Sequence, residues 1–289
     1  MESILYNVGM ANRISKIFAR DGKAMVLAID HRQRGIQEGI DNFNNLISLI
    51  ERLAPYIDAI MTTKEPLGQI ILNGNLRDKG LVLSLNRTGL AGTTFEMDDR
   101  LVCTVETALR WGLDGVKLLI KFNRDNLFTN EQLSLLSSVV EECEKWSIPL
   151  MVEPLYMNLE DGKLIMDRSY EAIKWVSIIT NDFRVPILKI PYVKSSSRKE
   201  GIEQFKMIRD SVNAKVLLLG GPKRDNPIEV LQDFEDGVKA GADGFVVGRN
   251  VFLSERPEVV ALAMKLILHE NYSAENAYRE ALNNVGRPV

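Results

Sequence analysis

Histidine and cysteine are scarce in this chain, which has two of each among its 289 residues. Zinc enzymes usually assemble several such ligands around the metal. His31 and His269 are far apart in the sequence, and Cys103 and Cys143 lack the spacing of metal ligands. We therefore expect no catalytic metal, and we interpret both cysteines as reduced packing residues.

Long apolar runs are also missing, since no stretch approaches the roughly 18 residues of a membrane helix. The first residues lack the basic and then apolar layout of a signal peptide, so we expect a cytoplasmic protein. The formal net charge of -3 gives no global basic field for nucleic acid. We expect neither nucleic acid nor a membrane as a partner, and any affinity for anions has to come from a local site.

Eight short apolar runs alternate with helical segments along the chain. They lack period-two alternation, which is typical of parallel strands buried on both faces. No Gly-x-Gly-x-x-Gly follows the first run, which disfavours the alternative of an open, doubly wound dinucleotide fold. We predict a single (β/α)8 TIM barrel of the α/β class over residues 1–289, with an N-terminal helical cap over roughly the first 20 residues. The predicted strands are residues 25–30, 59–63, 81–86, 115–121, 149–154, 187–192, 215–220 and 244–248.

Active sites of this fold lie at the carboxyl ends of the strands. Lys189 lies in the apolar run 185–192, where burial favours the neutral amine, which can act as a nucleophile. The alternative is a lysine that extends to solvent or pairs with a buried carboxylate. Polar residues or glycines near the ends of the other predicted strands are Asp30, His31, Lys64, Glu65, Asn86, Arg87, Lys117, Glu153, Tyr156, Gly220, Gly221, Gly248 and Arg249.

A neutral lysine condenses with a ketone to an iminium, which accepts electrons as the neighbouring carbon–carbon bond breaks. A second cation, Lys117, would help to keep Lys189 neutral. Asp30, Glu153 and Tyr156 are the available acids and bases. Asp30 could instead cap a helix, and Glu153 could be a structural partner of Lys117.

Two glycine-containing turns predict an anion site. Gly220 and Gly221 follow the seventh strand, and Gly248 with Arg249 follows the eighth, where many barrels hold a phosphate. The alternative is that these glycines only turn the chain. Arg34 and Arg87 could bind a second anionic group, although a solvated surface position is the simpler interpretation of either.

These motifs resemble the class I aldolases of the deoxyribose-phosphate and tagatose-bisphosphate aldolase superfamily, over residues 24–252. Residues 188–191, 152–154 and 115–119 are similar to the strands of tagatose-bisphosphate and sulfofructose-phosphate aldolases, which implies that Lys189 forms the Schiff base. Residues 219–223 and 247–252 are more similar to the phosphate turns of archaeal-type fructose-bisphosphate aldolases. Residues 86–92 and 95–100 resemble an uncharacterised bacterial branch.

The resemblance implies a Schiff-base aldolase that cleaves or forms a carbon–carbon bond in a small anionic ketose, either a sugar phosphate or a sulfosugar, without a cofactor. A dihydroxyacetone-type unit would be released or used, with an aldehyde as the other substrate. A transaldolase would transfer that unit to an aldehyde acceptor. The remaining alternatives are a phosphate-binding barrel isomerase or thiolase without a Schiff base, and a non-catalytic sugar-phosphate-binding protein. Barrels of this family are more often oligomers than monomers, so we expect a homo-oligomer.

Overall fold

Eight parallel strands close into a barrel in the computed structural model, which describes residues 7–87, 99–124, 128–161 and 163–285. The sheet runs in the order β6-β3-β2-β1-β11-β10-β9-β7, and pairing of β7 with β6 closes it. The predicted (β/α)8 barrel is therefore confirmed. Its strands are β1 (Ala24–Ile29), β2 (Ala59–Thr62), β3 (Gly80–Ser84), β6 (Gly115–Phe122), β7 (Leu150–Glu160), β9 (Ile187–Ile190), β10 (Lys215–Leu219) and β11 (Gly244–Val247).

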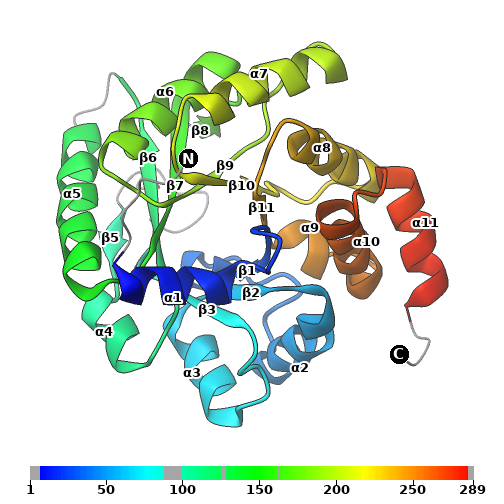
Figure 1. The fold of residues 1–289 in the computed structure, drawn as a ribbon, viewed down its shortest axis with the longest axis horizontal. Helices are drawn as coiled ribbons and strands as arrows, with labels where there is room; N and C mark the ends of the chain where they lie inside the picture. The colour runs from blue at the N-terminus through cyan, green and yellow to red at the C-terminus, as the bar shows by residue number, and fades with distance from the viewer. Residues whose placement is uncertain (1–6, 88–98, 125–127, 162, 286–289) are drawn as a thin grey trace.

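Helices surround the strands in a ring (Figure 1). Polar side chains cap the amino ends of several of these helices. For example, the Ser169 side chain accepts a hydrogen bond from the Ala172 amide at the first turn of α6. The C-terminal helix α11 (Ala274–Asn284) packs outside the ring against α8 and α10. The ring helices are α2 (Phe43–Leu53), α3 (Lys64–Asn73), α4 (Val105–Arg110), α5 (Phe128–Trp146), α6 (Tyr170–Asp182), α7 (Arg198–Asp210), α8 (Pro227–Lys239) and α10 (Pro257–Glu270).

The core has two layers. Small and medium apolar side chains, such as Ala28, Met61 and Val246, fill the barrel interior. Larger side chains fill the space between the strands and the helices, where the rings of Phe234 and Phe245 stack at 4.4 Å. Burial on both faces explains why the strands are almost continuously apolar.

The helix α1 (Val8–Ile17) closes the amino end of the barrel, where the N-terminal helical cap was predicted. Ile17 and Phe18 belong to the interior cluster of apolar residues. A Cβ added to Gly80 would lie 2.6 Å from the backbone oxygen of Lys16, and one added to Gly115 would lie 2.9 Å from Ile17 Cδ1. Glycine at the starts of β3 and β6 therefore makes room for this helix.

Aspartates fix the same end of the barrel. Asp58 Oδ2 accepts a hydrogen bond from the amide of Met25 at 2.7 Å, and Asp114 Oδ2 accepts one from the amide of Leu81 at 3.0 Å. Each carboxylate precedes one strand and holds the start of its neighbour. The opposite, carboxyl ends of the strands are left for a site.

The strand β7 continues beyond the barrel and turns back as β8 (Lys163–Met166), so that both form an antiparallel hairpin. The predicted fifth strand was too short, because it ended at residue 154 and did not include this hairpin. Short elements elsewhere are η1 (His31–Arg34), η2 (Ala54–Tyr56), β4 (Asn86–Arg87), β5 (Arg100–Leu101) and α9 (Arg249–Phe252). Within the described part of the chain, no helix is both long and apolar enough to cross a membrane.

Candidate active site

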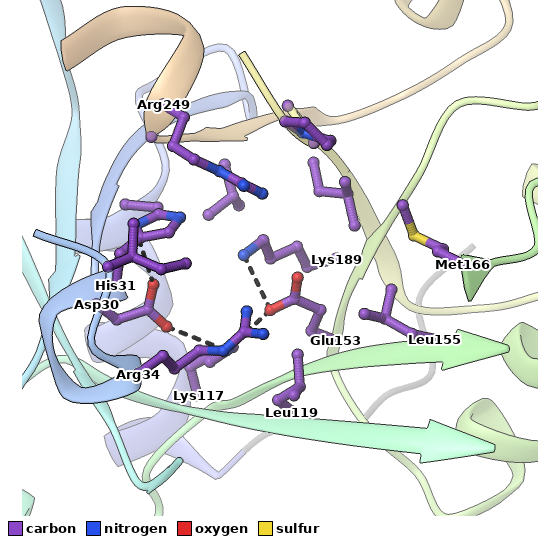
Figure 2. Close-up of a pocket in the computed structure, with 18 of the residues that line it drawn as sticks. Asp30, His31, Arg34, Lys117, Leu119, Glu153, Leu155, Met166, Lys189 and Arg249 are labelled. Atoms are coloured by element: carbon purple, nitrogen blue, oxygen red, sulfur yellow. Dashed lines mark hydrogen bonds and ion pairs between the residues drawn. The ribbon is translucent and has the colours of Figure 1, made fainter. Parts of the chain in front are cut away.

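A cavity of about 390 Å³ opens at the carboxyl ends of the strands (Figure 2). Its walls bring together side chains that are distant in the sequence, as the barrel predicts. Lys189 lies near the middle of the close-up, between Asp30 and His31, which follow β1, on one side and Leu155 and Met166 of the β7–β8 hairpin on the other. The polar and charged side chains in the lining are Asp30, His31, Arg34, Asn86, Arg87, Lys117, Lys121, Glu153, Lys189 and Arg249.

Four of these side chains form a chain of alternating charge. Lys189 Nζ lies 3.0 Å from Glu153 Oε2, and Lys117 Nζ lies 2.8 Å from the same oxygen. Lys117 Nζ also lies 3.2 Å from Asp30 Oδ2. All four are buried or nearly so, and two cations balance two anions, which lowers the cost of burying them together.

The pleat of the strands explains this convergence. Lys117 and Lys121 lie four residues apart in β6, so both point into the barrel mouth together with Leu119. The register pairs Leu119 with Glu153 and Lys117 with Met151, so Lys117 starts two residues nearer the strand beginnings and its long side chain reaches up to the Glu153 carboxylate. On the other side of β7, the pairing of Val152 with Leu188 places Lys189 next to Glu153.

The two lysines have opposite pKa shifts. Burial lowers the pKa of Lys189, and the nearby Lys117 lowers it further, against the attraction of Glu153. Burial opposes the charge on Lys117 too, but Glu153 and Asp30 on either side raise its pKa above the ordinary value. Lys117 is therefore the permanent cation, and Lys189 is the amine that loses its proton more readily.

Both carboxylates stay ionised. Burial alone would raise the pKa of Glu153, but the two lysines lower it to about 2. The pKa of Asp30 also lies well below its usual range, because Lys117, His31 and Lys189 outweigh the effect of burial. Both groups can accept a proton from a substrate held in the cavity.

The residues of the predicted anion site lie at the same mouth. A Cβ added to Gly248 would lie 2.4 Å from the Ala28 oxygen, and Gly221 has the left-handed φ of 66° that glycine tolerates. Asn250 Nδ2 donates to the Gly220 oxygen at 2.6 Å and joins the two turns. These contacts hold Gly220, Gly221, Gly248 and Arg249 on one side of the cavity.

Positive charge gathers there. Burial lowers the pKa of Arg249, and nearby Arg34 lowers it further. Arg249 Nε is buried with no hydrogen-bond partner among the residues that the structure describes. An anion bound beside Arg249 would relieve this repulsion and accept its hydrogen bonds.

Some residues at the predicted strand ends do not lie in the cavity wall. Tyr156 lies in β7 with its ring 5.7 Å from that of Trp175, and its hydroxyl accepts a 3.5 Å hydrogen bond from the Arg124 amide. Lys64 begins α3, where its amine lies over the ring of Trp111 at 5.8 Å. The structure therefore does not bring Tyr156 to the Lys189 cluster.

Other lining residues were not among the predicted site residues. Lys121 lines the cavity and lies 3.3 Å from Asp99, whose side chain is fully buried and whose pKa burial raises to about 6. His31 had been noted at a strand end without a role. Its ring packs edge-on against Phe252, and burial lowers its pKa to about 4, so it is neutral. Residues 88–98, which make up most of the two segments that resemble the bacterial branch, lie outside the described residues.

The sequence also matches a known protein family. The model of the Cgl0159-like family matches residues 22–266. The chain belongs to the Cgl0159-like family. A solved structure of Cgl0159 from Corynebacterium glutamicum is 25% identical, covers 91% of this chain and 93% of its own, and superposes with a TM-score of 0.79.

Two curated archaeal relatives match along almost their whole length. An uncharacterized aldolase of Saccharolobus solfataricus is 28% identical over 91% of this chain and 96% of its own. The 2-amino-3,7-dideoxy-D-threo-hept-6-ulosonate synthase 1 of Archaeoglobus fulgidus is also 28% identical, over 94% of this chain and 95% of its own. A Schiff-base-forming fructose-1,6-bisphosphate aldolase is 22% identical over 90% of this chain and all of its own, with a TM-score of 0.73, which supports the shared fold.

The curated relatives support an aldolase-like protein, and the solved structures support the shared barrel fold. They do not separate the deoxyribose-phosphate and tagatose-bisphosphate superfamily from its neighbours.

Proposed function

We propose that this protein is a Schiff-base aldolase acting on a small anionic ketose, with Lys189 as the nucleophile. The observation that carries the proposal is the cluster in which Lys117 and Lys189 contact one carboxylate, while the pKa of Lys117 is raised and that of Lys189 is lowered. A lysine that served only as an ion-pair partner would have its pKa raised, as Lys117 has. The curated relatives named as an aldolase and as a heptulosonate synthase support the same reaction class.

In the proposed reaction the Lys189 amine attacks the ketone carbon and, with loss of water, forms an iminium. A base removes the proton from the hydroxyl group on the β-carbon. This is the carbon that leaves as the aldehyde when its bond to the α-carbon breaks. The carbon–carbon bond then breaks, its electron pair moves toward the iminium to give an enamine, and an aldehyde is released. Protonation of the enamine carbon and hydrolysis release the second product, and the reverse sequence forms the bond.

Glu153 contacts the amine directly, so it is placed to transfer protons at the nitrogen and at the carbinolamine oxygen. Asp30 lies on the far side of Lys117 and is the second candidate base. Arg249 with Gly220, Gly221 and Gly248 would bind a phosphate or sulfonate, and Arg34 with Arg87 would bind a second anionic group. No metal or organic cofactor takes part in the proposed steps.

Borohydride trapping tests the proposal. The protein would be incubated with dihydroxyacetone phosphate, fructose 1,6-bisphosphate or a sulfofructose phosphate, reduced, digested and mapped by mass spectrometry. We expect a stable adduct on Lys189, and none in Lys189→Met. The matched control is Lys121→Met, which removes another lysine of the same cavity and should keep the adduct.

A turnover assay on the same ketoses, with and without an added aldehyde, separates the alternatives. Ketose cleavage without an added aldehyde supports an aldolase, whereas turnover that requires an aldehyde acceptor supports a transaldolase. Turnover without any adduct would overturn the proposal in favour of an isomerase or thiolase. Binding with neither turnover nor adduct would indicate a sugar-phosphate-binding protein.

A further inference from the structure

The β7–β8 hairpin presents a continuous apolar face to the cavity. Leu155 and Met157 of β7 and Leu164 and Met166 of β8 line the cavity directly. The antiparallel register pairs Met157 with Met166 and Leu159 with Leu164, so Leu159 lies on the same face. Leu159 is 68% exposed, so the outer part of this apolar face is open to solvent.

This face lies across the cavity from Asp30, His31 and Arg249 (Figure 2). The charged lining residue beside it is Lys121, which pairs with Leu155 in the neighbouring strand and whose amine is held by Asp99 at 3.3 Å. In the close-up, Leu155 and Met166 are on the other side of Lys189 from His31 and Arg249 (Figure 2). A ligand whose anionic group contacts Arg249 and whose carbonyl carbon reaches Lys189 would extend its remaining carbons toward the hairpin. A row of leucine and methionine side chains offers no hydrogen bond there, so a hydroxyl pressed against it would lose its water partners.

The base of the hairpin is held in place. Asn123 Nδ2 donates to the Met157 oxygen at 2.6 Å, and Arg168 Nε donates to the Tyr192 oxygen at 3.0 Å just beyond β8. The wall is thus a preformed part of the site, which suits a role in substrate selection.

We propose that the pocket face of the hairpin, formed by Leu155, Met157, Leu159, Leu164 and Met166, is a specificity subsite for a hydroxyl-poor, apolar part of the substrate. The preferred substrate is then a phosphorylated or similarly anionic ketose whose distal carbons are deoxygenated, rather than one hydroxylated at every carbon. The inference deepens the proposed aldolase function and rests on its placement of the anion and the carbonyl carbon.

Binding probes without a carbonyl group test the subsite separately from the chemistry. Hexyl phosphate and sorbitol 6-phosphate have the same chain length and the same anion, but differ in hydroxyl groups. By calorimetry we expect hexyl phosphate to bind about tenfold more tightly or better, because its methylene groups are buried against the hairpin.

Adjacent positions on the two faces of β8 supply the variants. Leu164→Asn should abolish most of this preference, whereas Ile165→Asn, at a 45% exposed position on the outer face, should leave it unchanged. If Leu164→Asn fails to fold, the more exposed Leu159→Asn replaces it. Equal affinities for the two probes, no binding of either probe, or equal effects of the two asparagine variants would overturn the proposal. Loss of the Lys189 adduct with the alkyl preference intact would instead refute the aldolase function and leave the apolar subsite.

Discussion

The amines of Lys117 and Lys189 form ion pairs with the same carboxylate oxygen of Glu153, at 2.8 Å and 3.0 Å. Two ammonium groups so close together repel each other, and the one with fewer anionic neighbours loses its proton first. Lys117 has a second partner in Asp30, at 3.2 Å, so the loss falls on Lys189. The arrangement therefore sets which lysine is the nucleophile.

Removal of Lys117 should make Lys189 a poorer nucleophile. In Lys117→Met the repulsion that lowers the pKa of Lys189 is lost, while Glu153 still raises it, so the pKa of Lys189 rises. Each unit of that rise reduces the neutral fraction about tenfold at neutral pH. We expect kcat/KM to fall and the acidic limb of its pH profile to move to higher pH.

The pH profile distinguishes this effect from general damage. A variant that merely folds poorly would lower kcat/KM by the same factor at every pH. The retention of an unchanged acidic limb in Lys117→Met would contradict the proposed role of Lys117. Lys121→Met is the matched control, because Lys121 lies on the same face of β6 and pairs with Asp99 instead.

Removal of the shared carboxylate should cost stability. In Glu153→Gln the buried amines of Lys117 and Lys189 lose their common anion, and breaking a buried ion pair typically costs about 3–5 kcal/mol. Asp30 remains beside Lys117, so we expect a loss at the lower end of that range. Urea denaturation of the wild type and the variant gives the difference, and a change below about 0.5 kcal/mol would show that the cluster does not depend on Glu153.

Much of the barrel could be predicted from the sequence, because strands buried on both faces leave a local signal. The apolar runs around Met25 and Lys189 could be predicted as strands without knowing which distant strands they pair with. The β7–β8 hairpin was missed although Asp161 and Gly162 form a dipeptide typical of tight hairpins. The predicted strand ended at Pro154, short of this dipeptide.

The site was less predictable, because its geometry depends on strand pleat and on long-range pairing. Glu153 and Tyr156 are three residues apart in one strand, so they point to opposite faces. The alternation of side chains along a strand separates Glu153 from Tyr156 only if the strand is known to continue past Pro154. The pairing of Lys121 with Asp99, by contrast, has no local signal and requires the folded barrel.

Tyr156→Phe should leave catalysis almost unchanged. The Tyr156 ring packs on Trp175 outside the cavity lining, so its hydroxyl does not face Lys189. We expect kcat/KM within about twofold of the wild type, against the effect of about 10²-fold or more typical of a lost acid or base. A loss of that larger size, measured by steady-state kinetics, would mean that the hydroxyl takes part in proton transfer.

Replacement of Arg249 should weaken anion binding more than it slows chemistry. Arg249 lies beside Gly248 in the cavity wall, and its guanidinium group is partly desolvated before any ligand binds. A hydrogen bond to a charged group contributes about 1.5–3 kcal/mol, so Arg249→Met should raise the Kd of inorganic phosphate about 10- to 100-fold. Arg249→Lys keeps the positive charge but not the planar, bidentate guanidinium group. Its Kd for phosphate should therefore lie between those of the wild type and Arg249→Met. Equal phosphate affinity in all three proteins would place the anion elsewhere.

The opposite end of the barrel should show its own pH dependence. His269 Nδ1 lies 2.8 Å from Asp21 and Nε2 lies 3.1 Å from Asp58, the carboxylate that also holds the start of β1. Burial alone would lower the pKa of His269, but the hydrogen bonds to Asp58 and Asp21 raise it above its ordinary value. A raised folded-state pKa stabilises the protein fully below the unfolded pKa of about 6.5, and that stabilisation is lost as the pH rises through the folded value.

His269→Gln isolates this contribution. The free energy of unfolding of the wild type should exceed that of the variant by more at about pH 6 than at about pH 8.5, because only the protonated imidazole is held by both carboxylates. Measurements should stay above about pH 5.5, since Asp21 has a lowered pKa and its own contribution is lost only in acid. Urea denaturation at each pH gives the two differences. The same difference at both pH values would mean that His269 is held as a neutral ring, and that the two aspartates fix it by hydrogen bonding alone.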